Sequence, residues 1–566
     1  MRPQGRDTLD SVYFDYPKFE VARAPELDGR TGSHDVVIVG AGPVGLTAAL
    51  ELARCGVHVC VLDDKTTVND GSRALCLARH SMESLAQLGV AERFLERALG
   101  WTSGRSYYRG EQVYTLSMPY SEDERFLPMY NLQQQYIEHY LCEAAHQHPL
   151  VEVRWGNAVE SVDWVDDTAR INVNSEHGTY QLDARYCLAA DGARSVVRKS
   201  FGLKLNGDAY EGKYVIADIR LKSDFPTERR AFFDPSANPG ATLLVHKQPE
   251  DIWRIDWQLQ PDESESEALE ESNIRAKVSA ILDMLEEGED WELEWWSIYK
   301  AFTLCLDNYR HGPFLFLGDA AHLVPIFGVR GLNSGLADAS NVAWKLAAVL
   351  QGNAEDRLLD TYSPERRGAT MEIFENAAKS TAFMTPPTYG QELLRDAVLS
   401  LSLRHEFARP FLNPRQSTPY IYDASSLTSA RDADAEFTCG PQAGAPLLDT
   451  RLDDGTHLLD HLSNGFQLLA FEQDERTWDE LSQALLSEPV PVHLIHVGRA
   501  RREAATNLSD GHGRLSERYG ACPGSAYLVR PDRHVAARWR QMSPAAMVQA
   551  LRIALGLTSG DNSDAQ

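Results

Sequence analysis

The segment from Asp35 to Asp63 constrains the fold more than any other part of the chain. An apolar run, Val36 to Val39, leads into a glycine-rich turn, and apolar residues then recur at helical spacing from Leu46 to Ala53. A second β-rich run follows from Val57 to Leu62. The pattern predicts a strand, a tight turn, a helix and a second strand, which together form a βαβ unit. The turn consists of Gly40, Ala41, Gly42, Pro43, Val44 and Gly45.

Glycines at these positions of a βαβ unit favour a dinucleotide site. The first glycine allows the tight turn, the second lets the backbone approach a pyrophosphate, and the third lets the helix pack closely on the strand. The phosphates then meet the free N–H groups at the start of the helix. Asp63 follows the second run about twenty residues after the glycines, where an acid binds a ribose hydroxyl. A glycine-rich turn of an ordinary α/β sheet does not explain this acid, but the segment leaves open whether the ligand is NAD or FAD.

Length and composition are typical of a globular protein with more than one domain. A chain of 566 residues is too long for one hydrophobic core, so we expect two or three domains. The formal net charge of −27 disfavours a nucleic acid or an anionic membrane as partner, because both require concentrated positive charge. The sequence has no apolar run of about 18 residues, and residues 1–33 lack the apolar core of a secretory signal. We therefore expect a cytoplasmic protein.

A second informative segment begins at Tyr186 with an apolar strand pattern that stops at Asp191-Gly192, where a polar helix start follows. An Asp-Gly pair by itself indicates only a turn. Two further polar residues are consistent with either a structural or a cofactor-binding role. Arg73 lies just beyond the second strand of the βαβ unit, and Gln134 precedes an amphipathic helix.

The third segment, from Gly312 to Gly335, is the most specific. It contains a strand that ends in Gly318-Asp319, a loop with Pro325, and a second glycine-rich turn before a long helix. A carboxylate at a strand end can accept hydrogen bonds from a sugar-alcohol chain, and N–H groups at a helix start stabilise developing negative charge. A reduced flavin needs both. A lone histidine beside such a turn, His322, is expected to be structural. The second turn contains Gly331, Leu332 and Asn333.

In their order and spacing, the three segments resemble those of the single-component FAD-dependent aromatic hydroxylases. This group includes para-hydroxybenzoate hydroxylase, phenol hydroxylase and 3-(3-hydroxyphenyl)propionate hydroxylase. The resemblance covers residues 34–385 and implies non-covalently bound FAD rather than NAD, with Asp63 in place of the more usual glutamate on the adenosine ribose. Matching positions imply that Arg73 and Gln134 contact the cofactor, and that Asp191 lies in a motif tied to FAD and pyridine nucleotide.

The same resemblance implies how the flavin end of the cofactor is held and what it does. Asp319 would meet the ribityl chain and Pro325 would lie beside the isoalloxazine ring. NADH or NADPH would reduce the flavin, O₂ would form a C4a-hydroperoxide, and OH would pass to a phenolic ring, so a small aromatic compound and O₂ are the expected partners. The residues expected near flavin N1 and O2 are Gly331, Leu332 and Asn333.

The implied fold class is α/β: a Rossmann-like FAD-binding domain, an inserted and mostly antiparallel β-sheet substrate domain, and a C-terminal thioredoxin-like domain. The β-rich, aromatic character of residues 214–260 agrees with such an inserted sheet. We expect the FAD-binding domain at residues 34–205 and 301–385, the substrate domain at 206–300, a linker with helices at 386–438, and the thioredoxin-like domain at 439–566.

Cysteine usage limits the role of the C-terminal domain. The eight cysteines are scattered without CxxC or metal-like spacing, which predicts reduced thiols rather than disulfides or a metal site. Past Cys439 the only cysteine is Cys522, so a redox role is not expected. We expect this domain to serve packing or subunit contact, which includes a homodimer, and to be dispensable for the chemistry because every matched cofactor motif precedes Leu336.

Phenol hydroxylation also requires a base. Deprotonation makes the ring more nucleophilic, so a general base is expected near the substrate hydroxyl. The candidates on the substrate sheet are Tyr210, His246 and Tyr299. Four aromatic residues of that sheet either keep water from the site or belong to the core: Phe232, Phe233, Trp253 and Trp257.

Other functions on the same scaffold remain open at this point. They are an epoxidase, an oxidase, a monooxygenase of a polycyclic or antibiotic-like substrate, and a non-catalytic flavin- or ligand-binding protein. Substrate-stimulated oxidation of NAD(P)H separates an enzyme from a binding protein, and the mass of the product separates a hydroxylase from the rest.

Overall fold

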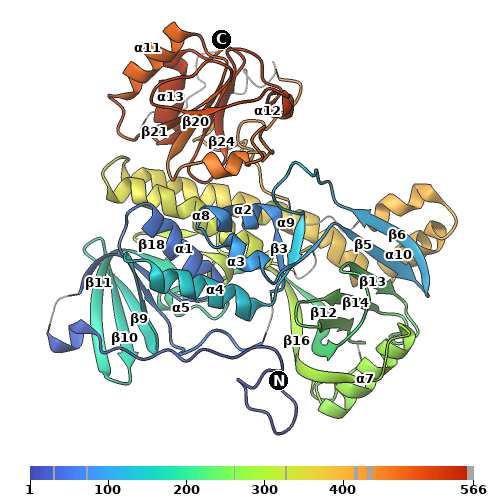
Figure 1. The fold of residues 1–566 in the computed structure, drawn as a ribbon. Coiled ribbons are helices and arrows are strands. Elements are labelled where there is room, and N and C mark those ends of the chain that lie inside the picture. The colour runs from blue at the N-terminus through green and yellow to red at the C-terminus, as the bar shows by residue number, and fades with distance from the viewer. Residues whose placement is uncertain are drawn as a thin grey trace.

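The computed structural model describes residues 1–29, 32–71, 74–260, 262–325, 328–413, 418–429 and 437–557, without the side chains of residues 209–211, 301 and 377–378. Figure 1 shows two large sheets side by side, a separate C-terminal lobe, and the long helices α8 (Gly331–Leu350) and α9 (Tyr362–Met384) between the lobe and the sheets. The mixed α/β class expected from the sequence is confirmed.

The first large sheet is built around the predicted βαβ unit. Its central strand β1 (Ser33–Val39) pairs in parallel with β2 (Val59–Leu62) on one side and with β11 (Gly178–Ala189) on the other. β18 (Phe314–Phe316) continues the parallel arrangement beside β11. These strands therefore all end at one edge of the sheet. The remaining strands of this sheet in the described residues are β8 (Val151–Arg154), β9 (Asn157–Val165), β10 (Thr168–Ser175) and β17 (Arg310–His311).

Helices cover this sheet and bury its apolar strands. α1 (Pro43–Arg54) begins with proline, whose missing N–H would have no intrahelical partner at that position anyway. It packs against α4 (Gln134–Gln147) and α8, and the apolar face of α8 is buried in the same core. Shorter helices around it are α2 (Arg79–Gln87), α3 (Ala91–Leu95) and α5 (Val196–Ser200).

The second large sheet is mostly antiparallel. Its strand order is β19-β16-β12-β15-β14-β13-β5-β6, in which the pair β13 and β5 is parallel. Two of its strands, β5 and β6, come from residues 103–117, which the sequence pattern did not connect with this sheet. The strands are β5 (Ser103–Tyr108), β6 (Glu111–Ser117), β12 (Asn206–Leu221), β13 (Arg229–Phe233), β14 (Thr242–Lys247), β15 (Ile252–Gln258), β16 (Trp291–Cys305) and β19 (His322–Leu323).

The two faces of this sheet differ sharply. One face packs against α7 (Glu271–Met284) through a core that includes Phe232, Trp253 and Trp257. Successive side chains of a strand point to opposite faces, so the intervening residues of β15 point away from this core. Of the four aromatics for which the sequence left site lining and core packing open, three thus belong to the α7 core, whereas Phe233 packs on the other side with Tyr214. The short helix α6 (Glu265–Ala268) precedes α7.

A small antiparallel sheet, in the order β3-β7-β4, contacts the second large sheet at the end of β14 and in the turn after it. Asn131 at the end of β7 donates from Nδ2 to the carbonyl of Lys247 at 2.7 Å. Just beyond β7, Gln133 donates from Nε2 to the carbonyl of Pro249 at 2.8 Å. Its strands are β3 (Cys76–Ala78), β4 (Leu99–Trp101) and β7 (Met129–Asn131).

The C-terminal lobe contains a five-stranded sheet in the order β22-β21-β20-β23-β24. The first three strands are parallel, and β23 and β24 run antiparallel to their neighbours. α10 (Tyr389–Ser402) lies in the segment before this lobe. The elements of the lobe are β20 (Phe466–Phe471), β21 (Val492–Val497), β22 (Thr506–Leu508), β23 (Ala526–Val529), β24 (Val535–Trp539), α11 (Glu475–Leu485), α12 (Arg514–Tyr519) and α13 (Pro544–Ala554).

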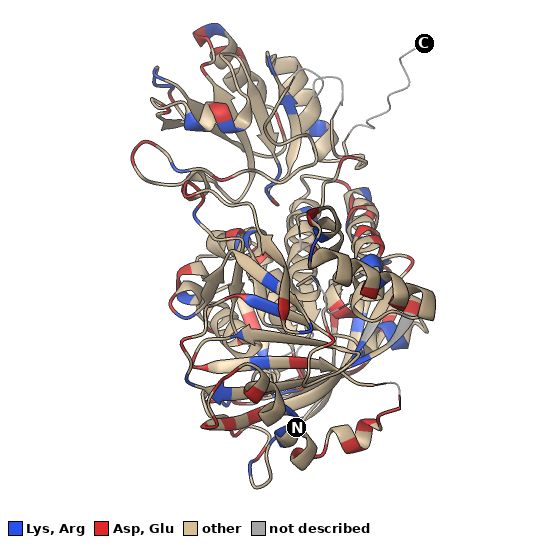
Figure 2. Ribbon diagram, turned by 90° about the vertical axis from the view of Figure 1, so that its right-hand side faces the viewer, with Lys and Arg blue, Asp and Glu red and all other residues tan. Residues whose placement is uncertain are grey.

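Charged residues of both signs and unpaired cysteines are spread over the fold. In the view of Figure 2, acidic and basic positions are interspersed along the ribbon. All eight cysteines are free thiols. Across the part of the chain that the structure describes, no helix combines the length and the apolarity needed to cross a membrane.

The tip of the β23–β24 hairpin inserts between α2, α8 and α9. Arg530 pairs with Glu365 of α9 (Nη1 to Oε1, 2.7 Å), and the same carboxylate pairs with Lys345 of α8 (Nζ to Oε2, 2.7 Å). Arg533 pairs with Glu83 of α2 (Nη1 to Oε2, 3.1 Å). All five side chains are buried. Trp344, Ala348 and Leu358, from α8 and the segment after it, also belong to the core of the C-terminal lobe.

This interface bears on the expectation that the C-terminal domain is dispensable. Removing the lobe would take away one of the two cations that hold the buried carboxylate of Glu365. It would also expose the apolar side chains that α8 contributes to the shared core. An unpaired buried charge and exposed apolar surface both destabilise what remains. The interface therefore gives a physical reason to expect that the rest of the protein depends on the lobe.

We predict that Arg530→Met destabilises the protein by about 3 to 5 kcal/mol, because it leaves a buried carboxylate without one of its cations. Arg476→Met is the matched control, since Arg476 forms an exposed pair with Glu480 in the same lobe and should change stability by at most about 1 kcal/mol. Urea unfolding followed by tryptophan fluorescence measures both. Equal midpoints for the two variants would contradict the assigned role of the hairpin tip.

Candidate functional site

Three of the predicted acidic residues and the glycine turn meet at the carboxyl edge of the first sheet. β1 ends at the glycine turn, β2 ends before Asp63, β11 ends before Asp191 and β18 ends before Asp319. In open α/β sheets, ligands bind in the crevice outside the carboxyl ends of the strands, where neighbouring connections leave in opposite directions. The fold thus brings together residues that are more than 250 positions apart in the sequence.

The glycines of the turn have distinct physical roles. Gly40 has φ +104°, and a Cβ there would lie 2.5 Å from the carbonyl oxygen of Ala190. A Cβ on Gly45 would collide with the carbonyl oxygen of Gly40. A Cβ on Gly42, by contrast, would meet no atom within 4 Å, so the space in front of the helix start is open. The first and third glycines are required by packing, and the second leaves room for a ligand.

Asp63 is coupled to the turn through its carboxylate. Its Oδ2 accepts from the backbone N–H of Ala41 at 2.6 Å, and its Oδ1 accepts from the N–H of Lys65 at 2.9 Å. Burial raises the pKa of Asp63 to about 6. The acid therefore stands directly beside the start of the turn, as the dinucleotide pattern predicts.

Asp191 turns the chain from β11 into α5. Its Oδ2 accepts from the N–H groups of Val196 and Val197 at 2.7 and 3.1 Å. Its Oδ1 is buried and has no hydrogen-bond partner among the described residues. Burial raises the pKa of this carboxyl. One oxygen of Asp191 thus has a structural role, and the other is available to a ligand at the sheet edge.

Asp319 and His322 have clearly different surroundings. Asp319 is exposed in the turn after β18. His322 is buried, and its Nε2 lies 2.7 Å from Oδ2 of Asp338, which also accepts from the N–H of Gly318 at 3.0 Å. Arg366 donates to the other oxygen of Asp338 at 2.6 Å. His322 thus lies in a buried network that holds the Gly318 turn, as expected for a structural residue.

The second glycine turn begins α8. Pro325 is buried before it, and the backbone of Gly331 and Leu332 is partly exposed at the first turn of the helix. The side chain of Asn333 is buried and donates to the carbonyls of Cys76 and Val329 at 3.1 and 2.8 Å. Its amide oxygen accepts from the backbone N–H of Ala78, also in β3, at 2.8 Å. Asn333 therefore contributes backbone to the turn and uses its side chain to hold β3 in place.

The remaining cofactor candidates are Gln134 and Arg73. Gln134 accepts from the N–H of Ala74 at 3.0 Å and donates to Glu138 at 2.7 Å. Arg73, the neighbour of Ala74, lies outside the described residues. Gln134 is therefore positioned beside the segment that carries Arg73, and contact of either residue with the cofactor stays a prediction.

The base candidates lie on the second sheet. His246 is buried in β14, and burial, together with Arg229 and Arg254, holds its pKa well below the usual value. Tyr299 is half-buried on β16, and the side chain of Tyr210 lies outside the described residues. Any role of the three as the base stays a prediction.

Sequence reasoning did not single out two buried groups on the same face as His246. Arg229 is its direct cross-strand neighbour, and Asp256 Oδ2 lies 3.9 Å from its Nε2. Burial raises the pKa of Asp256 to about 7. The alternation Trp253-Arg254-Ile255-Asp256-Trp257 was the available signal, because it separates an aromatic face from a charged face.

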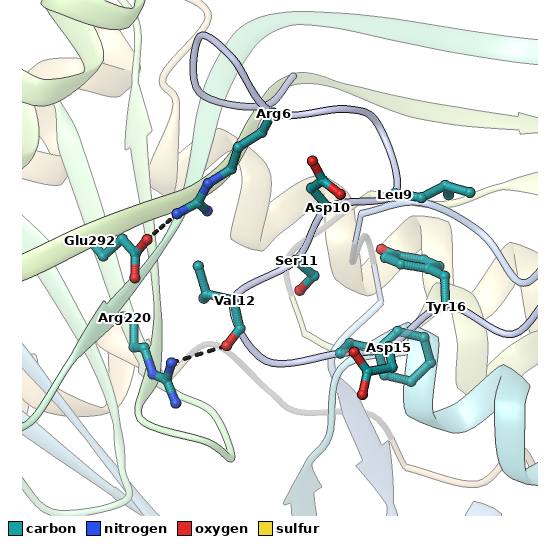
Figure 3. Close-up of a pocket in the computed structure, with 10 residues that line it drawn as sticks. Arg6, Leu9, Asp10, Ser11, Val12, Asp15, Tyr16, Arg220 and Glu292 are labelled. Atoms are coloured by element: carbon teal, nitrogen blue, oxygen red, sulfur yellow. Dashed lines mark hydrogen bonds and ion pairs between the residues drawn. The ribbon is translucent and has the colours of Figure 1, made fainter.

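A separate cleft of about 600 Å³ lies under the N-terminal segment (Figure 3). Arg6 pairs there with Glu292, and Arg220 donates to the carbonyl of Val12 at 3.0 Å. None of the residues predicted from the sequence lines this cleft. Its two arginines already have partners, so the sheet edge is the better candidate site.

The residues at the sheet edge fit FAD. The open space at Gly42 faces the N–H groups at the start of α1, which suits a pyrophosphate. The free oxygen of Asp191 and the exposed carboxylate of Asp319 supply acceptors for cofactor hydroxyl groups. The described residues contain no group of three or more His, Cys, Asp or Glu side chains that could hold a metal ion.

We predict that Gly42→Ala leaves the fold intact but weakens FAD binding, because its Cβ would occupy only the open space at the helix start. Gly45→Ala, which collides with the backbone of Gly40, should instead reduce the yield of folded protein. Isothermal titration with FAD and circular dichroism separate the two effects. A Gly42→Ala variant that binds FAD as tightly as the parent would rule out a pyrophosphate at this turn.

We also predict that Asp319→Ala weakens FAD binding by about 10- to 100-fold, the equivalent of one lost charge-assisted hydrogen bond. His322→Ala should change FAD affinity less and thermal stability more, because His322 contacts buried Asp338. FAD dissociation constants and melting temperatures of both variants test this. The assignments would be reversed if the histidine variant were the weaker FAD binder.

Comparison with known proteins agrees with this geometry. Residues 33–377, more than half of the chain, match the family model described as FAD binding domain, and residues 442–554 match the HcaD C-terminal domain. A protein of Mycolicibacterium gilvum named 3-(3-hydroxy-phenyl)propionate/3-hydroxycinnamic acid hydroxylase is 27% identical over 93% of this chain and 92% of its own length. A protein of Escherichia coli with the same name is 25% identical over 89% of this chain and 92% of its own length.

Solved structures share the fold. The complex of aklavinone-11 hydroxylase with FAD and aklavinone aligns with a TM-score of 0.74 and 26% identity, covering 93% of this chain and all of that chain. The flavin-dependent monooxygenase PieE, in complex with FAD and substrate, aligns with a TM-score of 0.76 and 23% identity over 92% of this chain and 99% of that chain. The family model matches more than half of the chain, and the cofactor motifs meet at the sheet edge. The chain therefore belongs to the FAD-binding family of single-component FAD-dependent aromatic hydroxylases.

Proposed function

We propose that the protein hydroxylates a phenolic compound with NADH or NADPH and O₂, using bound FAD. One oxygen atom enters the ring and the other leaves as water, while the nicotinamide loses a hydride and one proton is taken up. The observation that carries this proposal is the meeting of the glycine turn, Asp63, Asp191 and Asp319 at one sheet edge. The hydroxylase names of the relatives favour this reaction over epoxidation, oxidation or ligand storage.

The residues of the edge would hold FAD from one end to the other. Asp63 would bind the adenosine ribose, with Gln134 and Arg73 nearby, and the start of α1 at Gly42 would bind the pyrophosphate. Asp191 and Asp319 would accept from hydroxyl groups of the cofactor. When bound, FAD supplies hydride acceptance from the nicotinamide and activation of O₂. The residues proposed beside the isoalloxazine ring are Pro325, Gly331, Leu332 and Asn333.

The second sheet would hold the aromatic substrate against the second glycine turn, at the start of α8. The small sheet β3-β7-β4 is bonded to the end of β14 through Asn131, and Asn333 ties β3 to the start of α8. This arrangement would keep water from the space between substrate and cofactor, which oxygen transfer requires. The residues that take the proton of the phenol and position the ring would therefore come from β13, β14 and β15.

We further propose a domain division that follows the sequence expectation, with a C-terminal lobe that is thioredoxin-like and redox-inactive. The order of its mixed sheet, with a βαβ unit followed by an antiparallel hairpin and a helix, supports the likeness. The Cys522 thiol lies 3.4 Å from the hydroxyl of Ser525 and is not in a disulfide. The lobe would act as a structural support through its hairpin tip.

We predict that the purified protein is yellow, carries FAD, and oxidises NADH or NADPH faster when a phenol is added. A panel of phenols, assayed for NAD(P)H consumption and for a product 16 mass units heavier by mass spectrometry, tests the reaction. Gly42→Ala is the control, and it should lower both activities when FAD is limiting because it weakens FAD binding. A protein that binds FAD but gives no heavier product with any phenol would exclude hydroxylation of the panel.

A further inference from the structure

A row of charged side chains crosses the face of the second sheet that is opposite the α7 core. Strand register places Arg229, His246, Arg254 and Asp218 side by side on β13, β14, β15 and β12. Arg254 and Asp218 form a closed bidentate pair, with both N–O distances at 2.8 Å. Asp256 lies two residues along β15 from Arg254, on the same face. All five side chains are buried.

Three side chains of this row each have one polar atom without a hydrogen-bond partner in the part of the chain that the structure describes. Nη1 of Arg229, Nδ1 of His246 and Oδ1 of Asp256 have no hydrogen-bond partner among the described residues. Their exposures are only 9%, 5% and 8%. A buried polar atom without a partner is costly, and such atoms in native proteins are normally satisfied by a ligand or by water. The face thus carries a cation, a neutral ring and a carboxylate, each with a hydrogen-bonding atom that no described residue satisfies. This combination indicates a site for a polar molecule.

The row lies near the second glycine turn, at the start of α8. Cys76 of β3 accepts at its carbonyl from Nδ2 of Asn333, at the start of α8. The charges of Arg229 and Asp256 act on the Cys76 thiol, although burial is the larger influence on its pKa. Val329 of the glycine turn packs against the same small cluster as Cys76. A molecule in the row is therefore separated from the proposed isoalloxazine position by little more than one strand.

We propose that this row binds the substrate and selects a phenol that carries a carboxylate, with Arg229 pairing with the carboxylate and Asp256 accepting the hydroxyl hydrogen. This inference rests on the proposed function. β15 is the second strand from β13 in the sheet. Asp256 lies two residues along β15 from Arg254, which is in register with Arg229. The two Cα atoms are thus about 12 Å apart, which suits one ring with a short acidic chain.

Asp256 is suited to remove the proton. The O–H bond of the phenol breaks, the proton moves to Oδ1 of Asp256, and the electron pair stays on the oxygen as phenolate, which makes the ring more nucleophilic. Burial raises the pKa of Asp256 to about 7, near the operating range of an efficient general base. His246, whose pKa is well below its usual value because of burial, stays neutral and fills the space between the two charged residues.

The first experiment measures binding to the FAD-loaded enzyme. Two probes that differ in the carboxylate, 3-(3-hydroxyphenyl)propionate and 3-propylphenol, are titrated while the flavin absorbance is followed. Arg229→Met should weaken binding of the acid by about 10- to 100-fold and that of 3-propylphenol by less than about threefold. Arg230→Met is the matched control: Arg230 pairs with Glu228 at 2.6 Å, and its neighbour Phe232 faces the α7 core.

The second experiment tests the base. Asp256→Asn keeps the size of the side chain and should lower kcat for hydroxylation of 3-(3-hydroxyphenyl)propionate by about 10²- to 10⁴-fold. Binding of 3-phenylpropionate, which has no hydroxyl, should change by less than about threefold. FAD content and melting temperature verify that the variant is folded. If His246→Asn lost kcat to this extent while Asp256→Asn did not, the assignment of Asp256 would be overturned.

The outcomes separate this inference from the proposed function. An enzyme that hydroxylates 3-propylphenol as well as the acid, with Arg229→Met affecting both probes equally, would overturn the carboxylate site and leave the hydroxylase intact. A tight complex with the acid that is lost in Arg229→Met, without NAD(P)H oxidation by any phenol, would support the site and reject the hydroxylase.

Discussion

The buried carboxylate of Glu365 is the point on which the arrangement of the domains depends. It receives Lys345 from α8 and Arg530 from the C-terminal hairpin, and these cations outweigh the effect of burial and hold its pKa well below the usual range. The next residue, Arg366, bonds Asp338, which in turn fixes the N–H of Gly318 at the cofactor edge. Removing one partner from such a network leaves an uncompensated charge in the interior. One continuous set of buried contacts therefore connects the C-terminal lobe to the turn that carries Asp319.

The proposed chemistry is divided between two sheets with different physical characters. The parallel sheet presents strand ends, whose free N–H groups and acids suit a phosphate-bearing cofactor. The antiparallel sheet presents a face, because alternation puts aromatic side chains against α7 and charged side chains on the opposite face. The small sheet β3-β7-β4 joins the two, because Asn333 at the start of α8 bonds β3 and Asn131 bonds the charged sheet. In the proposed function, this small sheet would set the distance between cofactor and substrate.

Much of the fold could be predicted because its signals are local. The glycine turn, the helical spacing after it and the acid at Asp63 identified the βαβ unit, and strand alternation identified the antiparallel sheet. The charged face of that sheet could not be assigned, because alternation shows that two faces differ without showing which one is covered. The sequence therefore left Trp253 and Trp257 open between site lining and core, and the structure places both in the core under α7. Arg229 and Asp256 became candidates only when their missing partners were visible.

The sequence by itself determined the dinucleotide-binding turn and the absence of a CxxC pair, because each depends on residues close together in the chain. The order of three such local motifs then supplied the resemblance that implied FAD rather than NAD. Only the tertiary structure decided that strands from residues 103–117 join the second sheet, and that Arg530 reaches Glu365 across 165 positions. It also decided which polar atoms are left without partners in the interior. Such long-range pairs have no local periodicity, since they arise from packing of distant elements, and burial is a property of the whole fold.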